Sequence, residues 1–349
     1  MQNSFKVGKI KFSRFGKPVV IAEIGINHGG SLSEAIKLSK SAIKAGATII
    51  KHQTHIPEDE MSYHAKKIIP KNANSNIYKL INKCALSEKN EIKLMNYIKS
   101  YNVEYLSTPF SRKAVDRLVK FKVKAFKIGS GECNNYPLIK YICKFKKPII
   151  ISTGMNNINS IDKAIKIIEK SKIKYAILHC TSLYPTPDKF VNLSFINVLK
   201  RKYKNAIIGF SDHSQGIHNS LASVALGSSI IEKHYTDTFK RKGPDIRVSI
   251  DENQLARLIK ESNSVYESLK VHKKEIIQEN STKKFAYASV VATKKINKNS
   301  KFSLDNVWVK RPGTGEFLAK DLPKILGKTS KTNIKEGEQI KKNHLTKKK

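Results

Sequence analysis

The most constraining feature of this sequence is a repeated pattern in which a short apolar run ends in polar residues and an amphipathic segment follows. In the first unit, residues 19–28 form a β-branched run, and apolar residues then recur at spacings of three and four over residues 35–46. A strand, a helix, a short loop and another strand make the right-handed βα unit of a parallel sheet. The eight runs that we interpret as strands are 19–28, 47–53, 103–108, 125–129, 148–153, 175–180, 206–210 and 229–234.

Repeated βα units favour a closed (β/α)8 barrel, which typically needs about 250 residues. The chain has 349 residues, and we therefore expect an α/β fold in which residues 1–272 form a TIM-barrel domain. An open doubly wound sheet is the alternative arrangement of the same units. Residues 55–100 separate the second and third expected strands, and so long a connection is typical of an insertion that forms a lid or a dimer contact.

The last part of the chain has a different pattern, which indicates a second domain. A charged linker over residues 273–284 precedes a small β-rich domain over residues 285–349. Within it, residues 296–307 and 334–345 each contain an isoleucine, a turn and a polar stretch that ends on an aliphatic residue. We interpret these segments as the halves of a pseudo-duplicated module. A glycine-rich loop between them carries Arg311.

The composition argues against several classes of protein. A net charge of +38 would suit a nucleic-acid partner, but the lysines are spread almost evenly and no nucleic-acid-binding motif accompanies them, so we expect none. No uncharged apolar run approaches the ~18 residues needed to cross a membrane, and the N-terminus lacks the apolar core of a signal peptide. We expect a cytoplasmic protein without a membrane partner. Its cysteines form no Cys-x-x-Cys pair, so we expect reduced thiols at Cys84, Cys133, Cys143 and Cys180.

Two lysines at strand ends are the most informative polar residues. Lys127 lies in an expected strand that enters a Gly-Ser-Gly turn with Ser130 and Glu132, and Lys51 lies near the end of another strand. In a parallel barrel these ends surround one mouth, where an inward-facing lysine is costly unless an anion meets it. A small ligand with a phosphate and a carboxylate would satisfy both lysines and the nearby serines. Internal salt bridges to Glu23 and Glu132 are the alternative.

Two histidines at neighbouring strand ends predict a metal site. His213 and His234 follow the last two expected strands, and adjacent strands can hold two imidazoles on one divalent cation. Such a cation would keep positions for water and substrate oxygens, as a Lewis acid requires. A hydrogen-bonded core role is the alternative for each histidine. His52 and His55 cannot easily share a face of their strand, and we expect them only to form hydrogen bonds.

A series of short motifs at these strand ends covers nearly the whole barrel region. They are Ala22-Glu-Ile-Gly-Ile-Asn-His28, Lys51-His-Gln-Thr-His55, Ser107-Thr-Pro-Phe110, Lys127-Ile-Gly-Ser-Gly-Glu-Cys-Asn-Asn135, Ser152-Thr-Gly-Met155, His179-Cys-Thr-Ser-Leu-Tyr-Pro-Thr186, Gly209-Phe-Ser-Asp-His213, Glu232-Lys-His234 and Gly243-Pro-Asp-Ile246. Together they resemble the bacterial N-acetylneuraminate (sialic acid) synthase family, and residues 285–345 resemble that family's antifreeze-like (SAF) domain. The resemblance implies the same fold and a homodimer in which each SAF domain covers the partner's barrel mouth.

The resemblance also implies a reaction. Phosphoenolpyruvate condenses with the open-chain aldehyde of N-acetylmannosamine and with water, which gives N-acetylneuraminate and phosphate by C–O cleavage. His213 and His234 match the ligands of a divalent ion that polarises the aldehyde oxygen, most simply Mn²⁺, with Mg²⁺ or Co²⁺ as alternatives. The positions that match the binding site for phosphoenolpyruvate are Lys51, Thr108, Lys127, Ser130, Ser152, Ser182 and Ser211.

The remaining matched positions concern the sugar and the proton transfers. The resemblance implies that Glu132 and Glu232 transfer protons as water adds to C2 and phosphate leaves, and it places Lys127 and Glu23 among the catalytic residues as well. Positions that match contacts with the sugar are Glu23, Tyr184, Asp245 and, from the other subunit, Arg311.

One departure from the family bears on the substrate. Some members carry an asparagine where this chain has Ser182, so a hydrogen bond to phosphoenolpyruvate or to the sugar is shorter or replaced by water. The same condensation with another aldehyde is therefore an alternative, either a 2,4-diacetamido precursor of legionaminate or pseudaminate or a 6-phosphorylated N-acetylmannosamine. The 243–246 segment favours plain N-acetylmannosamine.

Overall fold

The structure, a computed structural model, describes residues 3–70, 74–270 and 276–346. The chain divides into two compact units, residues 1–270 and 271–349, and each is described by itself. The first residues of the expected linker, 273–275, lie outside the described residues.

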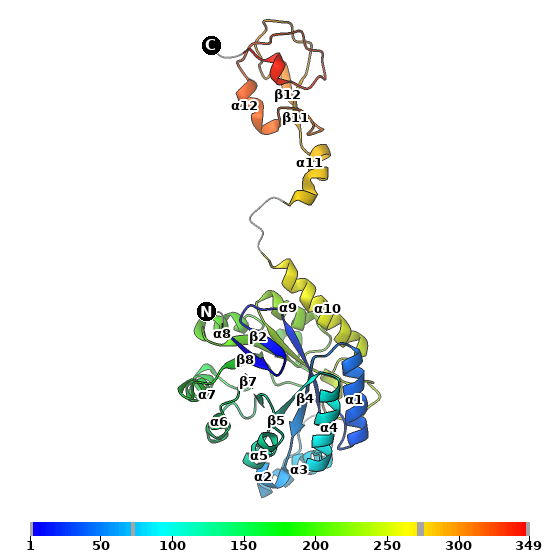
Figure 1. Ribbon diagram of the computed structural model, residues 1–349, viewed down its shortest axis with the longest axis vertical. Helices are drawn as coiled ribbons and strands as arrows, with labels where there is room; N and C mark the ends of the chain where they lie inside the picture. The colour runs from blue at the N-terminus through cyan, green and yellow to red at the C-terminus, as the bar shows by residue number, and fades with distance from the viewer. Residues whose placement is uncertain (1–2, 71–73, 271–275, 347–349) are drawn as a thin grey trace. The chain divides into compact units, whose positions relative to one another are not determined.

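The first unit is a nearly closed barrel of parallel strands surrounded by helices (Figure 1). In the described part of the chain, the hydrogen-bonded order of the eight strands is β5-β4-β3-β10-β9-β8-β7-β6, and the end strands β5 and β6 also contact each other. This closure confirms the expected (β/α)8 barrel and excludes the open doubly wound sheet. The strands are β3 (Val19–Gly25), β4 (Ile49–Thr54), β5 (Glu104–Pro109), β6 (Phe126–Ile128), β7 (Ile149–Ser152), β8 (Tyr175–Cys180), β9 (Ile207–Asp212) and β10 (Ile230–His234).

A helix follows each barrel strand. Several of these helices begin at a capping residue. The side chains of Ser31, Ser111 and Asn157 accept hydrogen bonds from backbone N–H groups of the first turn. Asp251 forms a capping box with Gln254. The helices are α1 (Leu32–Lys44), α4 (Glu88–Ser100), α5 (Arg112–Lys120), α6 (Tyr136–Cys143), α7 (Ile158–Lys170), α8 (Phe195–Lys202), α9 (His218–Ala225) and α10 (Glu252–Ser268).

The expected insertion over residues 55–100 is shorter than predicted. Its last part is α4, the barrel helix between β4 and β5, which sequence periodicity missed because the charged Glu91 lies on the buried face beside Leu94 and Ile98. The additional elements are α2 (Pro57–Glu60), η1 (Tyr63–Lys67) and α3 (Ile77–Cys84), and short 3-10 turns also form later at η2 (Asp188–Phe190) and η3 (Ile246–Val248).

An antiparallel hairpin that the sequence analysis did not predict precedes the barrel. It consists of β1 (Ser4–Val7) and β2 (Ile10–Ser13), with Phe5 paired to Phe12 and their ring centroids 5.3 Å apart. Phe5, Val7 and Phe12 are buried against inward-facing side chains from the first halves of the barrel strands, so the hairpin closes the N-terminal end of the barrel.

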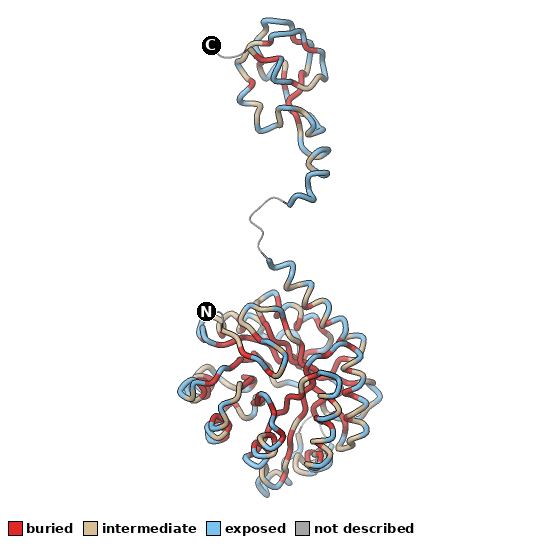
Figure 2. Tube along the Cα trace, in the orientation of Figure 1, coloured by how far each residue is buried: buried red, intermediate tan, exposed pale blue. Residues whose placement is uncertain are grey.

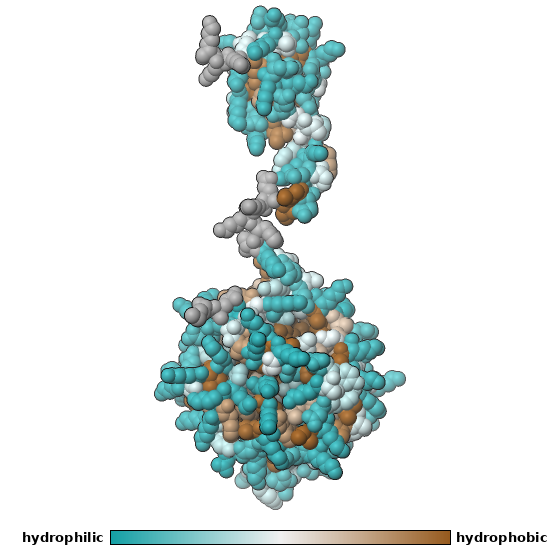
Figure 3. All heavy atoms as spheres, in the orientation of Figure 1, coloured by the Kyte–Doolittle hydropathy of each residue, from teal (hydrophilic) through white to brown (hydrophobic). Residues whose placement is uncertain are grey.

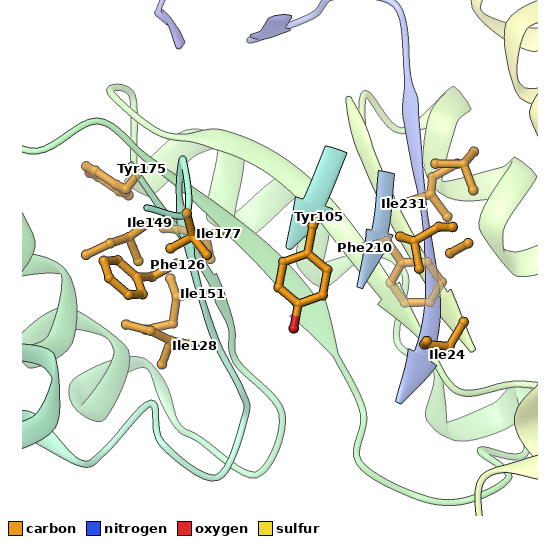
Figure 4. Close-up of a cluster of buried hydrophobic side chains, with 14 of the residues drawn as sticks. Ile24, Tyr105, Phe126, Ile128, Ile149, Ile151, Tyr175, Ile177, Phe210 and Ile231 are labelled. Atoms are coloured by element: carbon orange, nitrogen blue, oxygen red, sulfur yellow. The ribbon is translucent and has the colours of Figure 1, made fainter. Parts of the chain in front are cut away.

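Strand alternation divides the side chains between two environments. Outward-facing residues pack between the strands and the helices, as Figure 4 shows for Phe126, Ile151, Tyr175 and Phe210, and Figure 2 shows the buried strands inside the more exposed helices. Inward-facing residues form a lower, apolar layer near the hairpin and an upper, polar layer at the mouth. The lower layer includes Ile21, Ile49, Leu106, Ala125, Ile150 and Ile230, and the upper layer includes, two residues later on each strand, Glu23, Lys51, Thr108, Lys127, Ser152 and Glu232.

The second unit is a small β-rich domain, as expected. The two pseudo-duplicated segments pair through their isoleucines: Ile296 N donates to the Ile334 carbonyl at 2.9 Å, and Ile334 N donates back at 2.8 Å. Both side chains are buried in the core of this unit. Its elements are η4 (Ile277–Glu279), α11 (Asn280–Ala286), β11 (Ser289–Ala292), β12 (Val307–Lys310), η5 (Ala319–Asp321), α12 (Leu322–Ile325) and η6 (Lys342–His344), with β11 antiparallel to β12.

Hydrophilic side chains are spread over the visible face of the barrel unit in Figure 3 rather than gathered in one place. Among the described residues, no helix is long and apolar enough to cross a membrane.

Candidate active site

The C-terminal ends of the barrel strands surround a pocket of about 250 Å³. All of the predicted site residues line it except Asp245 and Arg311. The lining residues are Glu23, Lys51, Gln53, Thr108, Phe110, Lys127, Gly129, Ser130, Gly131, Glu132, Ser152, Met155, Ser182, Tyr184, Ser211, His213, Glu232 and His234.

Two buried lysines and two buried carboxylates form the floor of this pocket. Lys51 Nζ lies 2.7 Å from Glu23 Oε1 and 3.6 Å from Glu232 Oε1, and Lys127 Nζ lies 3.7 Å from the same Glu232 oxygen. None of the four residues is more than 5% exposed. Of the two internal salt bridges expected as the alternative, the one between Lys51 and Glu23 forms. The other carboxylate beside the lysines is Glu232, not Glu132. The lysines therefore face inward and share their charge with carboxylates.

Burial and charge act in opposite directions on these groups. Burial lowers the pKa of Lys51, but the Glu23 and Glu232 carboxylates outweigh it and the pKa is raised. The pKa of Lys127 is lowered by burial, and the attraction of Glu232 does not offset this. Burial would raise the pKa of Glu232, but the Lys127 and Lys51 ammonium groups lower it. The floor of the pocket is thus a set of two buried cations and two buried carboxylates that offset one another.

Hydroxyl groups surround the lysines. Lys127 Nζ donates to Ser152 Oγ at 2.7 Å, and Lys51 Nζ lies 3.4 Å from Thr108 Oγ1. In the loop after β7, Gly154 N donates to Ser130 Oγ at 3.0 Å. The Gly154 backbone also lies close to Ser182, because a Cβ atom added at Gly154 would be only 2.2 Å from Ser182 Oγ. This combination of cations, hydroxyls and a close backbone can hold the oxygens of an anion.

Glu132 lies apart from the charged floor, in the turn that follows β6. Its Oε2 atom is buried and has no hydrogen-bond partner among the described residues. Burial raises the pKa of the Glu132 carboxyl to about 7. A carboxyl group with this pKa changes its protonation state near neutral pH, as a general acid or base requires.

The two predicted imidazoles meet on one side of the pocket. The rings of His213 and His234 have centroids 5.3 Å apart, and the Tyr184 ring stacks on His213 at 4.2 Å. His213 Nδ1 lies 3.1 Å from the carbonyl oxygen of Thr181, so an Nδ1–H donor leaves Nε2 with its lone pair, 3.2 Å from the Tyr184 hydroxyl. Burial and nearby cations hold the pKa of His234 well below its usual range, which favours the neutral ring.

A third group of polar atoms converges around Gly25. A side chain at this position would have its Cβ 3.2 Å from Gln53 Nε2, 3.3 Å from Glu23 Oε1 and 3.4 Å from Asp245 Oδ2. Gln53 donates to Glu23 at 2.8 Å, and Asp245 Oδ2 lies 3.6 Å from His234 Nδ1. Asp245 therefore lies behind His234 rather than on the pocket surface, and burial with the nearby Glu23 charge raises its pKa to about 6.

Five further residues line the pocket without a predicted role: Gln53, Phe110, Gly129, Gly131 and Met155. Gln53 is one of the polar residues expected at the strand ends, and as the second residue after Lys51 on β4 it lies on the same face of the strand. Phe110 and Met155 follow strand ends in loops, where no periodicity signals their direction.

Two further predictions concern residues away from the pocket. His52 and His55 form hydrogen bonds as expected, His52 with the Tyr105 hydroxyl at 3.2 Å and His55 with Glu60 at 3.0 Å. Arg311 is exposed in the second unit, directly after β12. Its contact with a substrate stays a prediction.

Comparison with known proteins shows the family to which this chain belongs. The sequence model of the NeuB family matches residues 38–274, and that of the SAF domain matches residues 287–346. The chain is 37% identical over 337 residues to the N,N'-diacetyllegionaminic acid synthase of Campylobacter jejuni, covering 93% of this chain and 99% of the relative. It is 32% identical over 336 residues to the pseudaminic acid synthase of the same species, covering 95% and 97%.

A solved structure agrees with these sequence matches. The crystal structure of the N-acetylneuraminic acid (sialic acid) synthetase from Leptospira borgpetersenii, in complex with citrate, superposes with a TM-score of 0.74 at 30% identity, covering 81% of this chain and 95% of that one. The relatives named here make three different sialic-acid-type sugars. The chain belongs to the NeuB family of sialic-acid-type synthases and carries a C-terminal SAF domain.

Proposed function

We propose that this enzyme condenses phosphoenolpyruvate with the open-chain aldehyde of N-acetylmannosamine. A C–C bond forms between C3 of phosphoenolpyruvate and the aldehyde carbon. Water adds to the cationic C2 that results, and cleavage of the C2–O bond releases phosphate and leaves a ketone. The products are N-acetylneuraminate and inorganic phosphate.

The observation that carries this proposal is the pair of buried, inward-facing lysines among hydroxyl groups, next to two imidazoles. Phosphoenolpyruvate has a phosphate and a carboxylate, so it can satisfy Lys51, Lys127 and the surrounding Thr108 and serine hydroxyls together. To bind it, the lysines have to exchange part of their contact with Glu23 and Glu232 for oxygens of the ligand. The imidazoles lie on adjacent strands, on the side of the pocket where the aldehyde would enter.

The residues present fit a divalent metal ion, for which we propose Mn²⁺, with Mg²⁺ or Co²⁺ as alternatives. His213 can present Nε2 as a ligand, and His234 Nδ1 is a buried nitrogen without a hydrogen-bond partner in the described ranges. Within those ranges, no three His, Cys, Asp or Glu side chains are grouped to hold a metal. Water and substrate oxygens would therefore complete the coordination. Once bound, the cation supplies Lewis acidity to the aldehyde oxygen.

The carboxylates have distinct parts in the proposed reaction. Glu132, with a pKa of about 7, is suited to donate and accept the proton that moves as water adds at C2 and phosphate leaves. Glu232 lies between the two lysines and is the second carboxylate available for proton transfer. Glu23 and Gln53 form a hydrogen-bonded pair that can orient the hydroxyls of the sugar, and Tyr184 lines the same pocket.

A second acceptor is favoured by a specific observation. The alignment with the N,N'-diacetyllegionaminic acid synthase, at 37% identity, covers nearly the full length of both chains, so a 2,4-diacetamido hexose is the main competing substrate. A 6-phosphorylated N-acetylmannosamine is the third candidate acceptor, and the experiment below includes it.

The test is to incubate the protein with Mn²⁺, phosphoenolpyruvate and each of these three sugars, and to measure phosphate release and product mass. Phosphoenolpyruvate labelled with ¹⁸O at the bridging oxygen should give labelled phosphate, because the C–O bond breaks. Absence of metal-dependent phosphate release with all three sugars would refute the proposed chemistry. Faster turnover of the diacetamido sugar would correct only the acceptor.

We also propose a homodimer in which Arg311 contacts the N-acetyl group of the sugar in the partner's barrel. Subunit mixing tests this arrangement. In a mixed dimer, one subunit carries Lys127→Ala and the other carries Arg311→Ala. If Arg311 acts across the dimer, one of the two sites has both changes and the other site is intact. Mixing the two inactive variants should therefore restore activity. No recovery after confirmed subunit exchange would show that each SAF domain serves its own barrel.

A further inference from the structure

A buried ion pair lies directly behind the two imidazoles. Asp212 and Lys233 each immediately precede one of them in sequence, and they are register partners on β9 and β10. Lys233 Nζ lies 3.1 Å from Asp212 Oδ2, and both side chains are 0% exposed. The pair belongs to neither the pocket lining nor any role implied for the reaction.

The outward face of these two strands is otherwise apolar. Ile208 and Phe210 on β9, and Ile231 on β10, all belong to the hydrophobic core between strands and helices. A buried ion pair stabilises a protein no better than packed apolar side chains, because desolvation offsets the attraction between the charges. Stability alone therefore does not explain why charges stand at these two positions.

The contacts of the pair show what it holds. Asp212 Oδ1 accepts hydrogen bonds from Ser214 N at 2.8 Å and from Ser214 Oγ at 2.6 Å, while Lys233 Nζ donates to the Ser214 carbonyl. Asp212 Oδ2 also accepts from Ser220 Oγ on α9 at 2.6 Å. The backbone on both sides of His213 is thus fixed, and it is tied across to the residue before His234.

We propose that Asp212 and Lys233 are positioning residues that set the separation of the His213 and His234 imidazoles for a divalent cation. The inference rests on the metal site of the proposed function. With only two protein ligands, on separate strands, the geometry of the metal site depends strongly on the residues that hold each imidazole in place. Partners behind the ligands of a metal typically change its affinity by about 10- to 100-fold.

The test uses the full-length Asp212→Asn/Lys233→Met variant, which removes both charges together and leaves no unpaired buried charge. We expect its Mn²⁺ dissociation constant, measured by electron paramagnetic resonance of free Mn²⁺, to rise about 10- to 100-fold. Thermal unfolding should stay close to that of the unaltered protein, and phosphoenolpyruvate binding without metal should change less than about threefold, since Lys51 and Lys127 are untouched.

The Glu91–Arg117 pair provides a control, because the Glu91 carboxylate is buried, Arg117 is half-buried, and the two charges lie 3.0 Å apart behind β4 and β5, away from the imidazoles. Glu91→Gln/Arg117→Met should leave Mn²⁺ affinity unchanged. Equal weakening in this control, or unaltered affinity in the folded Asp212→Asn/Lys233→Met variant, would overturn the inference.

Two milder variants keep the inference testable if the double variant does not fold. Ser220→Ala removes one donor to Asp212 and leaves the ion pair in place, so it should weaken Mn²⁺ binding by about threefold to tenfold, less than the double variant does. Lys233→Arg keeps the charge and should retain more Mn²⁺ affinity than Lys233→Met. The reverse order would also overturn the inference, whereas unaltered protein that binds no Mn²⁺ would refute this inference and the proposed metal site together.

Discussion

The two layers of side chains inside the barrel come from the same strands, yet they differ in almost every physical property. The lower layer buries Ile21 and Ile150 against the β1–β2 hairpin, whereas the upper layer, two residues further along each strand, buries Glu23 and Ser152 around the pocket. Burial of apolar side chains stabilises the fold, while burial of charges opposes it. Side chains that stabilise the fold and side chains suited to chemistry are therefore separated by only two residues along each strand, so substitutions in the two layers should have separable effects.

The largest expected effect comes from the upper layer. Lys127→Ala removes an ammonium group that lies 2.7 Å from Ser152 Oγ and faces the proposed anion site. We expect turnover to fall by about 10³-fold, as for loss of a preorganised group that stabilises charge. Phosphate release measures the loss, and circular dichroism should show a folded protein. Full activity in this variant would mean that the anion site is misplaced.

The lower layer should show the opposite behaviour. Phe12→Ala removes a ring that is 1% exposed and packs on Phe5 at the closed end of the barrel. We expect the free energy of unfolding to fall by about 3 kcal/mol, as for a large core side chain replaced by alanine. The kcat and KM of the folded protein should stay within about twofold, because additivity holds for distant sites. Denaturant unfolding measures the first effect, and a large change in KM would show that the layers are coupled.

Glu132 lies in the turn just beyond the upper layer, and it tests whether a buried carboxyl group of the pocket lowers the stability of the fold. Its pKa is about 7 in the folded protein, against about 4.3 for an unperturbed glutamate. A raised carboxyl pKa means that its contribution to stability is present below the unfolded value and is lost as the pH rises through about 7. Glu132→Gln should therefore unfold at a higher temperature than the unaltered protein at pH 8, with a gain that shrinks toward pH 5.

The same substitution should lower kcat by about 10²-fold, the usual contribution of one general acid or base. Calorimetry at several pH values measures the stability effect, and phosphate release measures turnover. A stability gain that does not depend on pH would show that Glu132 is not buried as a titrating group.

The division into layers was largely predictable from the sequence, because it depends on strand periodicity. The β-branched runs located the strands, and their polar ends located Lys51, Lys127 and His213 at one mouth. The hairpin was missed because its strands have only four residues each, too short for a clear alternation. The choice of Glu232 over Glu132 as the partner of the lysines depends on how strands are staggered around the barrel, which a local pattern does not contain.

The smallest effect is expected from the outward face of the strand that carries Lys51. His52 follows Lys51 directly but points away from the pocket, with Nδ1 3.2 Å from the Tyr105 hydroxyl and the ring stacked on His28 at 5.2 Å. His52→Ala should cost about 2 kcal/mol of stability through the cavity left by the buried ring and the lost hydrogen bond, while Mn²⁺ binding stays intact. His213→Ala is the matched control and should abolish Mn²⁺ binding. Because strand neighbours face opposite sides of the barrel wall, loss of the metal in His52→Ala would contradict the separation of an inner chemical face from an outer structural one.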